Sequence, residues 1–248
     1  MIRFRLGLVI NPLAGLGGCV GLKGSDGVAD EALALGAEPK AALRMMQALE
    51  VIRDYADDIE VITALGIMGE DVAKSLGFTT RVVYQTPDKT QALDTQAVVR
   101  ALLDEPLDLL LFAGGDGTAR DVYSVFEQAT IDDKLPVLGV PAGVNGITPH
   151  ASGMVVKMLL DGELVSLMSA DVMDIDEVAF RQGTVRAKRF GELLVPAEPR
   201  YVQAVKMGGK EVDELVLADI AADVINQMED ELYIMGSGST VAFVMEEL

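Results

Sequence analysis

Two glycine-rich segments, each preceded by an aliphatic run, contain the residues best suited to chemistry. One reads LLLFAGGDGT over residues 109–118 and carries a single charged side chain, Asp116. Glycine lets a ligand approach the main chain itself, and the free N–H groups at the start of a helix attract phosphate. An aliphatic run that ends in such a segment therefore indicates a strand that leads into a phosphate-binding loop.

Asp116 has the wrong charge for binding phosphate directly, so its presence needs another explanation. A carboxylate in this place can hold a magnesium ion, or it can orient or deprotonate a hydroxyl that attacks a phosphoryl group. With a helix predicted to begin near Thr118, the combination indicates phosphoryl transfer. The alternative is a tight turn in which Asp116 only caps the helix.

The second glycine-rich segment, GLVINPLAGLGG at residues 7–18, also follows a strand-like run. It lacks the lysine and the serine or threonine of a P-loop, and it does not reproduce the dinucleotide fingerprint. Gly15 and Gly17 are therefore either phosphate-binding residues or parts of an ordinary connection. Lys23 follows among further glycines, a place where a cation could offset the charge of a triphosphate.

Other reactive residue types are scarce. One cysteine, Cys19, excludes an internal disulfide and cannot by itself form a zinc site, and one histidine, His150, removes most histidine-based catalysis from consideration. We interpret Cys19 as a packing residue and His150 as a solvated or helix-capping residue. The chemistry must therefore depend on Asp, Asn, Gly, Thr and Lys.

The net charge of the 248-residue chain is −19, which repels polyanions. We therefore expect neither nucleic acid nor an anionic membrane surface as a partner, whereas small anions can still bind to backbone N–H groups. Half of the residues are apolar, yet no apolar run is long enough to cross a bilayer and the N-terminus shows no signal-peptide pattern. These features predict a cytoplasmic protein with a small-molecule substrate.

The elements that must position these residues alternate along the first part of the chain. Short aliphatic runs predict strands at residues 4–10, 59–65, 80–86, 108–113 and 136–140. Amphipathic stretches predict helices at 39–56, 69–76, 90–103 and 118–129, with Pro39 in a first turn and Gly77 at a C-terminal cap. This alternation predicts an α/β fold, a doubly wound and mostly parallel sheet in which both glycine segments can lie at the carboxyl edge.

Residues 161–248 differ in pattern from residues 1–160, which we expect to form the α/β nucleotide-binding domain. From about residue 165 polar and apolar residues alternate between turn signals, which predicts a smaller β-rich domain with antiparallel strands. A helix at 211–227, a strand at 232–236 and a helix from 240 are predicted to follow. The sequence stops within that last helix, so the second domain is either shortened or ends in a helix.

Four motifs resemble a known family. They are NPLAGLGGCVGLKGSDG, FAGGDGTARDVYS, LGVPAGVNG and YIMGSGSTVAFVMEEL, and they span nearly the whole chain. Together they resemble the superfamily that joins NAD kinases, diacylglycerol and sphingosine kinases, and phosphofructokinases. Within it they are most similar to the divergent ATP-NAD kinase-like branch, which includes proteins associated with acetoin catabolism.

The resemblance also implies roles for individual residues. Asp116 would orient or deprotonate the attacking hydroxyl, and Asn11 would lie near the phosphoryl donor. The residues bordering the nucleotide phosphates would be Gly114, Gly115, Gly117 and Thr118, with the same crevice lined by Gly143 and Asn145. A turn of the second domain would reach the nucleotide through Gly238, Ser239 and Thr240.

The activity implied by the resemblance is phosphorylation of the 2′-hydroxyl of NAD, which makes NADP. ATP, or else polyphosphate, would donate the phosphoryl group with Mg²⁺ as the metal, and we expect a homo-oligomer. The family's asparagine–acid pair that binds the NAD ribose has no clear counterpart here, which favours an alternative, a non-catalytic nucleotide-binding accessory protein. A lipid kinase is a weaker alternative, because the chain is acidic and lacks a basic amphipathic stretch.

Overall fold

The computed structural model of the protein describes residues 4–17, 20, 29–129, 135–142, 148–163, 165–175, 187–198, 210–229, 232–236 and 239–248. The chain forms two compact units, Met1–Gln203 and Ala204–Leu248. Both glycine-rich segments belong to the first unit. The predicted site residues Lys23, Gly143, Asn145 and Gly238 lie outside the described residues, as does Cys19.

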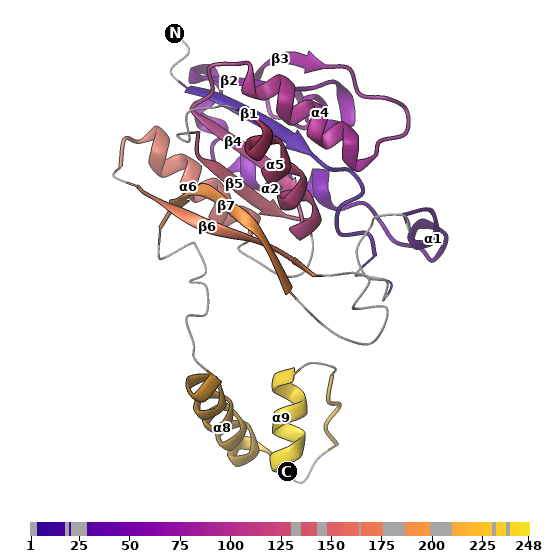
Figure 1. The fold of residues 1–248 in the computed structure, drawn as a ribbon, viewed down its shortest axis with the longest axis vertical. Coiled ribbons are helices and arrows are strands. Elements are labelled where there is room, and N and C mark those ends of the chain that lie inside the picture. The colour runs from indigo at the N-terminus through magenta and orange to yellow at the C-terminus, as the bar shows by residue number, and fades with distance from the viewer. Residues whose placement is uncertain are drawn as a thin grey trace. The chain divides into compact units, whose positions relative to one another are not determined.

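A five-stranded parallel sheet forms the centre of the first unit (Figure 1). Its strands are β1 (Phe4–Ile10), β2 (Ile59–Ala64), β3 (Thr79–Tyr84), β4 (Leu109–Gly114) and β5 (Val137–Pro141). Every pairing between neighbours in this sheet is parallel. The α/β fold is therefore confirmed, and the five predicted strands agree with the observed ones to within two residues.

The strand order, β3-β2-β1-β4-β5, decides where a ligand can bind. The chain moves outward from β1 to β2 and β3, and it then returns to place β4 on the other side of β1. In an open α/β sheet this reversal leaves a crevice beyond the carboxyl ends of the two strands at which it occurs. These strands are β1 and β4, and the two glycine-rich segments directly follow them.

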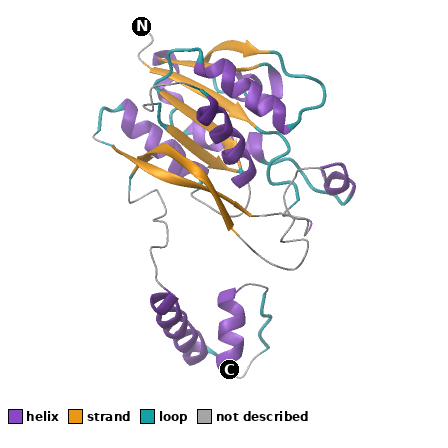
Figure 2. Cartoon of the chain, viewed as in Figure 1, coloured by secondary structure: helices purple, strands orange, loops and turns teal. Residues whose placement is uncertain are grey.

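Helices connect the strands. The first unit contains α1 (Ala29–Ala34), α2 (Ala41–Glu50), α3 (Glu70–Ser75), α4 (Ala92–Leu103), α5 (Asp116–Gln128), α6 (Pro149–Leu160) and the short 3₁₀ helices η2 (Arg53–Asp58) and η3 (Gly66–Met68). They cover both faces of the sheet (Figures 1 and 2). Alternate side chains of β4 pack on opposite faces, with Leu111 in the cluster of α2, α3 and α6, and Leu110 in the cluster of α4 and α5. This double burial explains why β4 is apolar throughout.

Two helix predictions need correction. The helix predicted at 39–56 ends at Glu50, because the N–H groups of Val51 and Ile52 bond to the carbonyls three residues earlier, which tightens the chain into a 3₁₀ turn. Pro39 is not in the first turn, since Lys40 is the N-cap residue. The cap at Gly77 is confirmed: its φ is +87°, and its N–H donates to the carbonyl of Lys74 at 3.0 Å.

An antiparallel hairpin, β6 (Ser166–Ile175) and β7 (Ala187–Ala197), packs against the α5 side of the sheet. Val172 and Leu193 join the same apolar cluster as Val122 of α5. The hairpin belongs to the first compact unit, which extends to residue 203. The division of the chain into a domain of residues 1–160 and a domain of residues 161–248 remains a prediction from the sequence.

The second unit contains α8 (Lys210–Gln227) and α9 (Ser239–Glu247), which pack against each other and agree with the two predicted helices. The strand predicted at residues 232–236 is wrong, and Figure 2 draws this segment as a loop. Leu232 and Ile234 are 93% and 94% exposed, so their apolar alternation is not matched by burial. A strand needs a partner for its backbone groups, and none of the described residues pairs with this segment.

The packing of α6 on α2 generates a stability prediction. A methyl group added at Gly153 would lie 2.3 Å from the main-chain oxygen of Ala48, which cannot move without shifting α2. Overpacking of this kind costs about 1–3 kcal/mol, which exceeds the gain of up to about 1 kcal/mol from alanine's helix propensity. We expect Gly153→Ala to lower the free energy of unfolding measured in urea.

The matched control is Gly236→Ala, because a methyl group there meets no atom within 4 Å and the residue lies outside the helices. The control should unfold at the wild-type urea concentration. Wild-type stability of Gly153→Ala would show that α6 does not pack closely on α2.

Candidate functional site

The two glycine-rich segments meet at the reversal point of the sheet. Ile10 pairs with Ala113 where β1 and β4 end, and the N–H of Asn11 donates to the carbonyl of Ala113 at 3.0 Å. β1 ends at Ile10 and β4 ends at Gly114, and the chain leaves the sheet there. The two segments therefore begin at the same edge of the sheet.

Asn11 joins the segments through its side chain. Its Nδ2 donates to Oγ1 of Thr118 at 3.0 Å, and its Oδ1 accepts from the N–H of Leu13 at 3.1 Å. Thr118 is buried, with 3% of its surface exposed, and the hydrogen bond is partly shielded from solvent. Asn11 thereby orders its own segment and links it to the first turn of α5.

The turn between β4 and α5 is shorter than predicted. The helix begins at Asp116 instead of near Thr118, which leaves Gly115 as the single residue between strand and helix. Gly115 is the N-cap residue and has no side chain, so Asp116 is not the capping residue of α5. The main chain reaches the helix start directly, with its first N–H groups still unpaired within the helix.

The glycines of this turn allow other atoms to come close to the main chain, and they do not adopt unusual backbone angles. Gly114, Gly115 and Gly117 all have φ values outside the positive range. A Cβ at Gly114 would lie 2.2 Å from Cβ of Thr118, so Gly114 is needed for packing of the turn itself. A Cβ at Gly115 would meet nothing within 4 Å, so the main chain there is open to a ligand.

The first glycine segment has a different construction. Residues 12–17 form successive turns, in which Gly15 has φ +80°. Leu16 is fully buried and packs with Ala32 of α1. The segment is therefore anchored by a side chain as well as by Asn11, and the roles of Gly15 and Gly17 in binding phosphate stay predictions.

Asp116 lies beside a cavity of about 220 Å³. The cavity is bounded by the sheet, α5 and the hairpin, and its lining includes Phe112, Asp116, Ala119, Gly139, Val172 and Leu193. The carboxylate remains open to solvent at this edge, but the surrounding protein removes part of its hydration. This burial, followed by the negative charge of Asp174, raises the pKa of Asp116 above that of an ordinary aspartate.

The arrangement can bind an anion and hold a base next to it. The unpaired N–H groups and partial positive charge of the α5 N-terminus suit phosphate, while Asp116 projects from the same first turn. Among the described residues, no group of three or more histidine, cysteine or acidic side chains is placed to hold a metal ion.

The remaining described candidates lie in other helices. Ser239 and Thr240 lie in α9 of the second unit, and their predicted contact with nucleotide stays a prediction. His150 is exposed in the first turn of α6, where Thr148 provides the cap. The sequence did not identify Arg120 and Asp174 as candidates. They form an ion pair near Asp116, but 54 residues separate them and no spacing pattern relates them.

Comparison with known protein families agrees with this geometry. Residues 6–162 match the family model of the ATP-NAD kinase N-terminal domain, which is more than half of the chain. The chain belongs to the ATP-NAD kinase family. The match runs from β1 through α6 and thus contains the reversal point, both glycine segments and Asp116. Membership supports a kinase-like, nucleotide-binding function.

No curated protein matches the chain. None of the described helices of this ATP-NAD kinase family member is both long and apolar enough to cross a membrane.

Substitution by alanine should have different effects at the neighbouring residues Gly114 and Gly115. Gly115→Ala should cause no overlap within the protein and should weaken nucleotide binding, because the methyl group would occupy the open face of the main chain. Loss of one hydrogen bond to a charged group costs about 1.5–3 kcal/mol, or roughly tenfold to a hundredfold in affinity. Titration calorimetry with ATP and with ADP measures this loss.

Gly114→Ala is the contrasting variant. Its methyl group would overlap Thr118, so we expect a lower free energy of unfolding as well as weaker binding. Wild-type ATP affinity of a folded Gly115→Ala protein would mean that nucleotide does not approach this turn.

Proposed function

We propose that the protein transfers a phosphoryl group from ATP to the 2′-hydroxyl of NAD, which makes NADP. The observation that carries this proposal is the position of Asp116: it stands in the first turn of α5, next to the open main chain of Gly115, at the reversal point of the sheet. The family match supports the reaction class. Both the donor's phosphates and a reacting hydroxyl could therefore lie within reach of one helix terminus.

Different residues of the chain would have separate roles in this reaction. The N–H groups at the start of α5 bind donor phosphates, and the Asn11–Thr118 hydrogen bond keeps the first glycine segment against that turn. Asp116 orients the 2′-hydroxyl and accepts its proton as the oxygen bonds to the γ-phosphorus and the bond to ADP breaks. The apolar cavity beside Asp116 keeps water from the acceptor side.

Mg²⁺ fits this site as an ion carried by the donor. Magnesium in kinase sites is bound largely by substrate phosphates and water, with few protein ligands. When bound, the ion would neutralise charge on the transferred phosphoryl group, and the α5 N-terminus would bind the oxygens that the ion leaves free.

The direct test is formation of NADP from NAD, ATP and Mg²⁺ by the purified protein. We expect Asp116→Asn to reduce kcat by about 10²–10⁴, the usual contribution of a general base, while the Kd for ATP changes little. Glu127→Gln is a matched charge control on the same helix, eleven positions further along, and should retain full activity.

Three results would contradict parts of this proposal. NADP formation by Asp116→Asn at the wild-type rate would remove the assigned role of that residue. Binding of ATP and NAD without product from either ATP or polyphosphate would favour a nucleotide-binding accessory protein. Turnover that requires lipid vesicles as acceptor would favour a lipid kinase.

The pH dependence of kcat/KM should reflect the ionisation of Asp116. The residue accepts a proton only when it is ionised, so kcat/KM falls as pH drops through its pKa. Burial and the charge of Asp174 raise that pKa, so the fall should begin at a higher pH than an ordinary aspartate would give. The measurement is kcat/KM for NAD across the acidic range with ATP saturating. A profile that stays flat down to the pKa of an ordinary aspartate would contradict this role.

A further inference from the structure

An ion pair ties the hairpin to the helix that carries Asp116. Nη1 of Arg120 on α5 lies 2.8 Å from Oδ2 of Asp174 on β6. The two side chains are 30% and 15% exposed, so the pair is largely shielded from water. Arg120 follows Asp116 by four positions, which places both residues on the same face of α5.

A β-bulge brings a third group to this pair. Val172 pairs with Gly191 and Met173 pairs with Arg189, so Phe190 of β7 is an extra residue between them. A bulge redirects side chains that regular alternation would turn away. The ring of Phe190 lies under the guanidinium of Arg120, at 5.8 Å from its centroid. Arg120 is thus held by both strands of the hairpin.

The same contact brings a second carboxylate near Asp116. Asp116, Val172 and Met173 line one cavity, and the carboxylate of Asp174 follows Met173 on β6. Burial is the main cause that raises the pKa of Asp116, and the negative charge of Asp174 adds to it. A positive charge at Arg120, one helical turn further along α5, is expected to act in the opposite sense. The ion pair therefore places two opposed charges next to the base.

We propose that Asp174 and Arg120 are positioning residues for the proposed phosphoryl transfer. Asp174, held by Arg120, strengthens Asp116 as a proton acceptor, and the positive charge of Arg120 limits that effect. The inference rests on the proposed role of Asp116 as base. It assigns the hairpin a function in the reaction besides covering the sheet.

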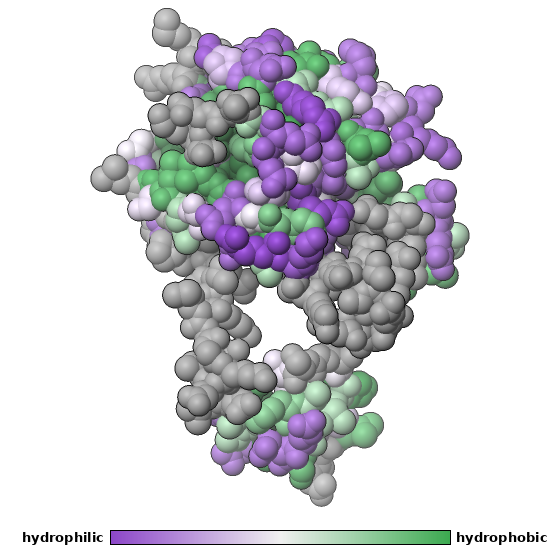
Figure 3. Space-filling view, viewed as in Figure 1, coloured by the Kyte–Doolittle hydropathy of each residue, from purple (hydrophilic) through white to green (hydrophobic). Residues whose placement is uncertain are grey.

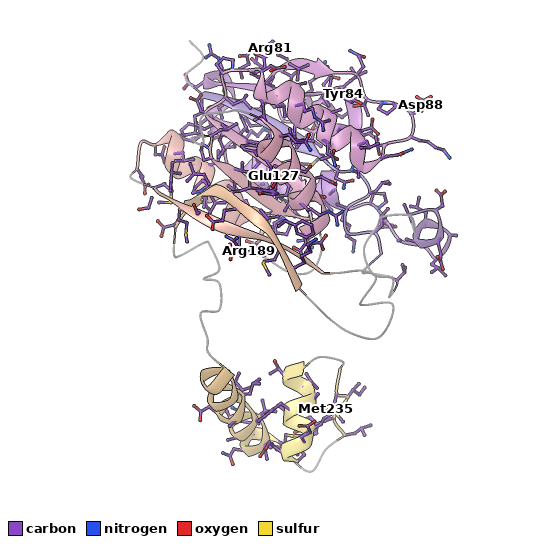
Figure 4. All side chains as sticks on the ribbon, viewed as in Figure 1. Arg81, Tyr84, Asp88, Glu127, Arg189 and Met235 are labelled. Atoms are coloured by element: carbon purple, nitrogen blue, oxygen red, sulfur yellow. The ribbon has the colours of Figure 1, made fainter. Side chains whose placement is uncertain are left out.

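Other charged groups face α5, and the described structure gives partners to most of them. Asp121 accepts from Gln96, Glu127 accepts from Tyr123, and Asp171 and Glu192 both pair with Arg189 (Figure 4 labels Glu127 and Arg189). Asp94 and Arg100 of α4 bond to Tyr84 and Gln128, and Lys188 lies 5.0 Å from the ring of Phe190. The face that α5 and the hairpin present in Figure 3 is mixed, with apolar side chains among the hydrophilic ones, and Leu167, Met168 and Met173 of β6 are exposed. Asp174 is the acidic group whose charge acts on Asp116.

Two substitutions separate this role from a purely structural one. Asp174→Asn keeps the shape and a hydrogen-bond acceptor for Arg120 but removes the negative charge, so the pKa of Asp116 should fall. Arg120→Met keeps the aliphatic length but removes the positive charge, so the pKa of Asp116 should rise. In the double variant both charges are gone, and the pKa should return toward the wild-type value.

The experiment is a pH titration of the full chain labelled with ¹³C at the aspartate carboxyl, with Asp116→Asn identifying the Asp116 signal. Arg53→Met, which breaks an exposed pair with Glu50, is the control and should leave the titration unchanged. Shifts in opposite directions for Asp174→Asn and Arg120→Met support the proposal. Absence of a shift, or shifts in the same direction, overturns it.

Kinetics give a second and separable readout. In an active protein, the acidic limb of kcat/KM should move to lower pH in Asp174→Asn and to higher pH in Arg120→Met, and Asp174→Glu should restore the wild-type limb. A uniform loss of kcat with an unmoved limb would indicate structural support only and would overturn the proposal. If the wild-type protein makes no NADP, the proposed function fails, while the carboxyl titration still decides whether the pair acts on Asp116.

Discussion

The hydrogen bond between Asn11 and Thr118 joins the two parts of the chain on which this site depends. It connects the end of β1 to the start of α5 across 107 positions of sequence, at the reversal point of the sheet. Strand order alone brings the two segments to the same edge, but this contact determines how they face each other. Gly114 allows it indirectly, because a Cβ there would displace Thr118.

The remaining features of the site follow from that junction. With Gly115 as the single residue between strand and helix, the unpaired N–H groups of α5 stand directly at the crevice. Asp116 is then held between this anion-binding turn and a cavity closed by the hairpin. A phosphoryl donor and an acceptor can thus approach one carboxylate from two sides, which agrees with the kinase-like function that family membership supports.

Much of the fold could be predicted from sequence because buried parallel strands leave a strong signal. The run LLLFAG is apolar since helices cover both faces of β4, and Gly77 marks a helix end through its positive φ. The predicted strand at 232–236 failed because apolar alternation does not show whether a partner strand is present. The helix α6 was not predicted, although Thr148 and Pro149 are signals for the start of a helix. The contact between Arg120 and Asp174 was not predicted either, because it is a tertiary contact that produces no periodic pattern in the sequence.

The central claim is that nucleotide phosphates bind the main chain where β4 passes into α5. The most direct measurement is the change in backbone amide NMR signals when ATP and Mg²⁺ are added to ¹⁵N-labelled protein. We predict that the largest changes occur at Gly115, Asp116 and Gly117, together with the side-chain amide of Asn11. Saturable binding that leaves these four signals unmoved, with changes confined to other parts of the chain, would contradict the account.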